Sequence, residues 1–120
     1  MQQGNIIKLE TYGKITVISF LTASISGGSD VDEVAGDVRD YIDKEKPSKV
    51  IVDFTGVKFF SSQVLGMLVD IWKRLKKFDG RVIISAINPE LSRVFKITNL
   101  DTLFDFYPDR QAALDAFASD

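Results

Sequence analysis

Hydrophobic residues follow two different spacings in the middle of the chain. Val50–Val52 is a run of β-branched residues with no polar alternation, which is typical of a strand that a parallel sheet buries on both faces. From Val64 to Phe78, apolar residues instead recur every three or four positions, as one face of a helix requires. The pattern therefore predicts a central strand, a turn and a helix, with Ser61 and Ser62 at the N-terminus of that helix.

Similar patterns predict the remaining elements. Residues 6–12 and 14–20 are β-prone runs on either side of Gly13, which indicates a hairpin. The pair Asp30 and Glu33 is expected to cap the start of a helix. Further strands are expected over residues 81–85 and 103–107, and further helices after Asn88-Pro89 and Pro108-Asp109. The alternation predicts a single α/β domain over residues 1–120, with a mixed, mostly parallel sheet of about four or five strands and about four helices.

The composition argues against several classes of function. The 120 residues include no cysteine and no histidine, so thiol chemistry, the commonest zinc ligand and the usual general base near neutral pH are missing. No catalytic residue, metal site or cofactor is therefore expected. A net charge of −2 gives no electrostatic reason to expect nucleic-acid binding. The chain shows neither a leader-like start nor a membrane-length apolar run, which predicts a soluble, cytoplasmic protein without membrane insertion.

A serine at the start of a helix has two explanations. Its hydroxyl can cap the helix by accepting a bond from a free backbone N–H, which is worth about 1 kcal/mol. Alternatively, the serine is covalently modified. A phosphate would add about −2 charge where free N–H groups and the helix dipole favour anions. The position of Ser61 and Ser62 leaves both explanations open.

Two blocks of the sequence resemble a known family. DFTGVKFFSSQVLG, residues 53–66, resembles the signature of STAS domains, the anti-sigma-factor antagonist family, and RVIISAINPELSRVFKITNL, residues 81–100, resembles the family's following strand and Pro-led helix. The resemblance extends over essentially the whole chain and puts Ser62 on the family's phosphoacceptor serine. In this sequence Ser61, Gln63 and Val64 stand where the family usually has Asp, Ser and Gly.

The resemblance implies a phospho-regulated binding module that takes part in partner switching and has no enzymatic activity of its own. The unmodified domain would bind an anti-sigma factor that is also a serine kinase of the histidine-kinase-like ATPase fold. Phosphorylation of Ser62 would end that binding, and a metal-dependent serine phosphatase would restore it. Ser61 is a second candidate position for modification or recognition.

The partner-binding residues are expected on both sides of the acceptor. In STAS relatives the loop that here contains Ser26 and Gly27 is implied to lie beside the phosphoacceptor serine and to contact the partner. A glycine in the first turns of a helix costs up to about 1 kcal/mol relative to alanine, and it tends to mark a close approach of another backbone. We therefore hypothesise that Gly66, with Gln63 and Met67, forms a docking face next to Ser62.

Two other functions compete with this one. One is a non-switching STAS adaptor or scaffold subunit, in which Ser62 is only a helix cap and the same face docks constitutively. The other is a receiver-like phosphoacceptor or small α/β enzyme that uses Asp53 at the C-terminal end of the central strand. Phosphorylation of an aspartate needs Mg²⁺ held by further carboxylates, and the first strands offer only Glu10. This absence argues against the Asp53 alternative.

Overall fold

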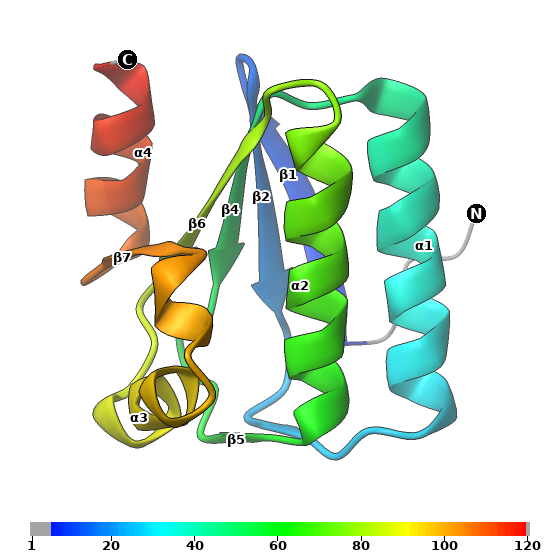
Figure 1. Cartoon of the computed structure of the whole chain (residues 1–120), viewed down its shortest axis with the longest axis vertical. Helices are drawn as coiled ribbons and strands as arrows, with labels where there is room; N and C mark the ends of the chain where they lie inside the picture. Colours follow the sequence, from blue (N-terminus) through cyan, green and yellow to red (C-terminus); the bar gives the residue numbers. More distant parts are fainter. Residues whose placement is uncertain (1–5, 120) are drawn as a thin grey trace.

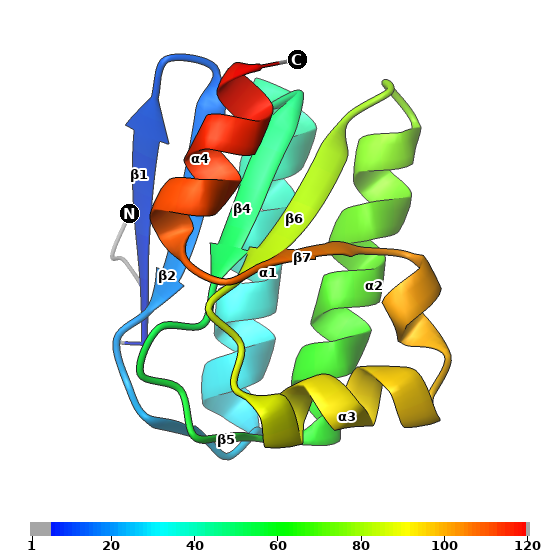
Figure 2. The ribbon, with the colours of Figure 1, turned by 90° about the vertical axis from the view of Figure 1, so that its left-hand side faces the viewer.

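A five-stranded sheet separates two layers of helices (Figures 1 and 2). The computed structural model describes residues 6–119. The elements are β1 (Ile7–Tyr12), β2 (Ile15–Phe20), β3 (Ser24–Ile25), α1 (Ser29–Glu45), β4 (Lys49–Asp53), β5 (Phe59–Phe60), α2 (Ser62–Lys76), β6 (Arg81–Ser85), α3 (Pro89–Ile97), the short 3₁₀ helix η1 (Leu100–Thr102), β7 (Asp105–Tyr107) and α4 (Arg110–Ala118). The predicted domain also includes residues 1–5 and 120, which lie outside the described residues.

The strands lie in the order β1-β2-β4-β6-β7. β1 and β2 form the predicted antiparallel hairpin around Gly13, and β4, β6 and β7 run parallel to β2. The described residues therefore form a mixed, mostly parallel sheet of five strands with four α-helices. The predicted α/β fold is confirmed.

The central strand β4 supplies both faces of the sheet, as its apolar run predicts. Val50 and Val52 join the large core under α1 and α2, whereas Ile51 packs in a smaller cluster with Ala113 and Phe117 of α4. Successive side chains of a strand point to opposite faces, so a strand covered on both sides carries apolar residues at consecutive positions such as Val50–Val52. Figure 2 shows α4 on one face of the sheet and α1 and α2 on the other.

The start of α1 differs from the prediction. The helix begins at Ser29, its N-cap is Gly28, and no side chain caps it, so the proposed capping pair of Asp30 and Glu33 is wrong. Gly28 has a φ of +84°, a conformation that glycine adopts without steric cost. The backbone therefore turns into the helix two residues before the position at which a capping aspartate was expected.

The loop before α1 contains a strand that the sequence pattern did not predict. β3 pairs in parallel with β5, with Ser24 opposite Phe59 and Ile25 opposite Phe60. Strands of two residues carry no periodicity that a pattern could detect, because their pairing is made by backbone groups. The small sheet holds the loop after β2 against the segment that leads into α2.

Candidate functional site

The N-termini of α1 and α2 lie side by side at one end of the molecule, next to β5 (Figure 1). The backbone N–H of Ser61 donates a hydrogen bond of 2.9 Å to the carbonyl of Ile25. This bond and the β3–β5 pairing bring the loop with Ser26 and Gly27 next to the start of α2. The expected proximity of this loop to Ser62 is therefore observed.

The two adjacent serines differ in exposure. Ser61 is the N-cap of α2, but its side chain makes no capping bond, and its Oγ is buried without a hydrogen-bond partner among the described residues. Ser62 is the first helical residue and is exposed. The capping explanation is therefore wrong for Ser61, which occupies the cap position without the bond. Ser62 lies one position past the cap, with its side chain open to solvent.

Gln63 connects α2 to the loop and to α1. Its Oε1 accepts a hydrogen bond of 2.7 Å from the backbone N–H of Gly28, and its Nε2 donates one of 2.8 Å to Oδ1 of Asp32. Gly27, with a φ of +92°, lies so close that a Cβ there would be 2.7 Å from Ser61 Oγ and 2.7 Å from Gln63 Oε1. Gln63 was expected to contact a partner, and in this structure its carboxamide is engaged within the chain.

The two other expected docking residues on α2 have opposite environments. Gly66 is exposed, and a Cβ added there would meet nothing within 4 Å, so the helix leaves open space at this position. Met67 is only 6% exposed and belongs to the large core. Its assignment to an exposed docking face is therefore corrected. The helical spacing already contained this signal, because Met67 lies three residues after Val64 and four before Ile71.

A polar network lies on the opposite face of the sheet, under the start of α4. The carboxylate of Asp53, 1% exposed, accepts hydrogen bonds from Ser85 Oγ at 2.7 Å, Thr55 Oγ1 at 3.0 Å and Arg110 Nη2 at 3.1 Å. The hydrogen bond to Asp53, more than any other contact, raises the pKa of the Arg110 guanidinium, while partial burial opposes it. Sequence analysis did not predict Arg110 as the partner, since the two residues are 57 positions apart.

This network weakens the case for Asp53 as a phosphoacceptor. The carboxylate is buried and both of its oxygens already accept hydrogen bonds. Within the described part of the chain, no three side chains of His, Cys, Asp or Glu come together as metal ligands. The Asp53–Arg110 pair instead connects the end of β4 to the start of α4.

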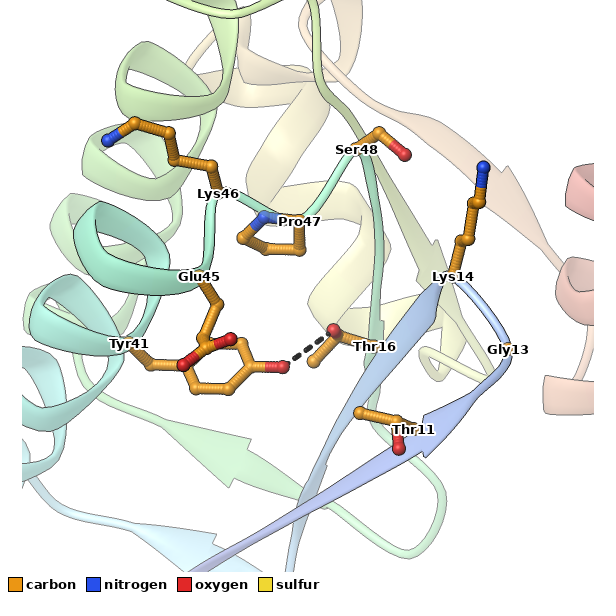
Figure 3. A pocket seen from close by; sticks show the side chains of 9 residues that line it. All are labelled: Thr11, Gly13, Lys14, Thr16, Tyr41, Glu45, Lys46, Pro47 and Ser48. Atoms are coloured by element: carbon orange, nitrogen blue, oxygen red, sulfur yellow. Dashed lines mark hydrogen bonds between the residues drawn. The ribbon is translucent and has the colours of Figure 1, made fainter.

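A shallow hollow of about 340 Å³ lies at the end of the molecule away from Ser62 (Figure 3). At its base the hydroxyls of Thr16 and Tyr41 share a hydrogen bond of 3.0 Å, and Lys14 and Lys46 lie at its edge. None of the residues expected to act in binding or modification lines it. Among residues 6–119, no helix has the length and apolar composition needed to cross a membrane.

Comparisons with known proteins agree with the fold. The family model of the STAS domain matches residues 7–113. An anti-sigma-factor antagonist (STAS) domain protein from Planctomyces limnophilus is 30% identical, with a TM-score of 0.84 over 93% of this chain and 97% of that one. Phosphorylated SpoIIAA of Bacillus, a cell fate determinant, has a similar fold, with a TM-score of 0.74 at 20% identity over 92% of this chain and 98% of that one. BtrV of Bordetella bronchiseptica, a candidate anti-sigma factor antagonist, is 22% identical over 93 residues, which are 78% of this chain and 79% of that protein.

Proposed function

Since this chain belongs to the STAS domain family, we propose that it is an anti-sigma-factor antagonist whose binding is controlled by phosphate on Ser62. The observation that carries the proposal is the exposure of Ser62 at the first position of α2, next to Ser61, whose Oγ is buried. SpoIIAA of Bacillus, which has a similar fold, exists in a phosphorylated form, so a phosphate is compatible with a fold of this kind.

The helix start can accept a phosphate without unfolding. The first N–H groups of an α-helix have no partner within the helix, and its dipole places partial positive charge at this end. An anion on Ser62 is therefore compatible with the folded domain. The modification would change the surface and leave the core intact.

The same anion is unfavourable inside a protein interface. A phosphate with about −2 charge that loses water without gaining a partner charge costs on the order of several kcal/mol. Because about 1.4 kcal/mol corresponds to a factor of ten in affinity, phosphorylation would weaken binding by two or more orders of magnitude. This magnitude is sufficient to separate a bound from a released state.

The proposed partner is an anti-sigma factor that is also a serine kinase of the histidine-kinase-like ATPase fold. It would bind the face formed by Ser62, Gly66 and the loop of Ser26 and Gly27, all at the same end of the molecule. A metal-dependent serine phosphatase would return Ser62 to its unmodified form. In this proposal the domain is a binding module and the partners carry out the chemistry.

A second candidate function is a non-switching STAS adaptor. Gln63 already connects α2 to the loop through Gly28 and to α1 through Asp32. The proposed docking face can therefore be held in one arrangement without any modification. Such a domain would bind its partner whatever the state of Ser62. The two functions therefore differ in what a negative charge at Ser62 does.

Two measurements test the proposal. Mass spectrometry of the protein isolated from its native cells should find phosphate on Ser62. Wild type and Ser62→Ala should capture the partner equally. Ser62→Asp should bind the partner with an affinity at least tenfold lower. Equal capture by all three proteins would reject the switch and leave the adaptor.

A further inference from the structure

The Ser61 hydroxyl is in an unfavourable environment for a polar group. Its Oγ is buried, and no donor or acceptor among the described residues reaches it. A buried hydroxyl without a hydrogen bond is less stable than the same group in water. The surrounding structure must therefore hold the residue in this position, and the contacts that do so can be identified.

The backbone of Gly27 covers this hydroxyl. A Cβ at Gly27 would lie 2.7 Å from Ser61 Oγ and 3.3 Å from Ser61 Cβ. The first distance is shorter than a Cβ contact allows without a shift, and the φ of +92° also favours glycine here. The hydrogen bond from the Ser61 N–H to the Ile25 carbonyl, 2.9 Å long, holds the loop at a position two residues before Gly27. The loop thus lies over Ser61 and leaves Ser62 outside.

Gln63 holds the covering segment in place. One side-chain amide binds two separate elements: the Gly28 N–H in the loop at 2.7 Å and the Asp32 carboxylate in the first turn of α1 at 2.8 Å. Both bonds are exposed to solvent, and exposed hydrogen bonds contribute little net free energy. Loss of these two bonds would therefore leave the domain folded.

We propose that Gln63 is a latch that closes Gly27 over Ser61 and so determines which of two adjacent hydroxyls a kinase can reach. With the latch closed, Ser62 is the single acceptor. With the latch open, Ser61 becomes a second one. This inference rests on the proposed function, because the selection has a biological consequence only if a kinase acts at this end of the molecule.

The absence of cysteine from the chain allows a direct test without kinase or partner. Ser61→Cys and Ser62→Cys each provide a single thiol, whose reaction with 5,5′-dithiobis(2-nitrobenzoate) is followed by absorbance. Rate constants are compared per thiolate, from their pH dependence, because a helix N-terminus lowers the pKa of a thiol. We expect the thiol at position 61 to react at least tenfold more slowly than that at 62.

The role of the latch is tested by adding Gln63→Ala to each single-cysteine protein. The thiol at 61 should then react about three to ten times faster, as the loss of weak hydrogen bonds predicts, and the thiol at 62 should change less than twofold. Gln111→Ala is the matched control. Gln111 also binds an aspartate, Asp115 at 3.0 Å, but on α4, so neither thiol should respond.

A second measurement keeps the native serines, since a sulfur at position 61 is larger than the oxygen it replaces. Amide hydrogen exchange of Gly28, measured by NMR, should be about three to ten times faster in Gln63→Ala than in wild type. Equal thiol rates at 61 and 62, or unchanged Gly28 exchange in Gln63→Ala, would overturn the latch. Such a result would leave the phosphate on Ser62 unaffected, whereas absence of phosphate would reject the proposed function and not the latch.

Discussion

Replacement of Gly66 should make the domain more stable while weakening its binding to a partner. Gly66 lies inside α2, is exposed, and a Cβ there meets nothing within 4 Å. A glycine inside a helix is less favourable than glutamine by about 0.5 kcal/mol. Gly66→Gln should therefore stabilise the domain by about 0.5 kcal/mol and raise its melting temperature by about 2 °C.

The same side chain should obstruct docking. Glutamine at position 66 would extend into space where an added Cβ meets no described residue within 4 Å, so its side chain would occupy volume that a docked partner needs. A partner backbone that approaches the helix here would be displaced, and we expect at least a tenfold loss of affinity, or about 1.4 kcal/mol. Stability is measured by thermal unfolding, and affinity by titration of the captured partner.

The matched control is Gly36→Gln in α1. Gly36 is also inside a helix, and a Cβ there would meet only the flexible tip of Arg39 at 3.6 Å, so a similar gain of about 0.5 kcal/mol is expected. It lies outside the proposed docking face, and binding should not change. Undiminished affinity in Gly66→Gln would refute the docking face, and a lower melting temperature would refute the inference of open space.

Three further substitutions, two of them paired with a comparison variant, test the contacts around the two sites. Asp53→Asn should lower the free energy of unfolding, measured in urea, by about 1–3 kcal/mol, because it breaks a buried ion pair whose arginine is partly solvated. Asp105→Asn, in an exposed ion pair, should lower it by less than about 0.5 kcal/mol, and equal losses would contradict the assigned burial of Asp53. Gly27→Ala should destabilise the domain more than Gly28→Ala, because both glycines have a positive φ but only a Cβ at Gly27 would lie 2.7 Å from other side chains. Equal midpoints of urea unfolding for the two variants would argue against that contact. Ser61→Ala should not show the loss of about 1 kcal/mol typical of a capping serine, because its hydroxyl makes no bond; a loss of that size in thermal unfolding would indicate a missed capping bond.

Local patterns in the sequence determined the architecture. The run Val50–Val52 predicted a strand buried on both faces, as observed. The spacing from Val64 to Phe78 predicted the following helix, which is present but ends at Lys76, before Phe78. These inferences succeed because periodicity depends on neighbours a few positions apart. The α/β fold could be predicted without the family resemblance. Only the resemblance distinguished Ser62 from Ser61 as the expected phosphoacceptor.

The tertiary structure decided which polar side chains are exposed and which are bound to other parts of the chain. Gln63 meets Gly28 across 35 positions of sequence, and Asp53 meets Arg110 across 57, so no local pattern contains either contact. The pairing of β3 with β5 depends on backbone groups that carry no side-chain signal. Sequence alone therefore located two serines at the start of a helix, and long-range packing buried one hydroxyl and exposed the residue beside it.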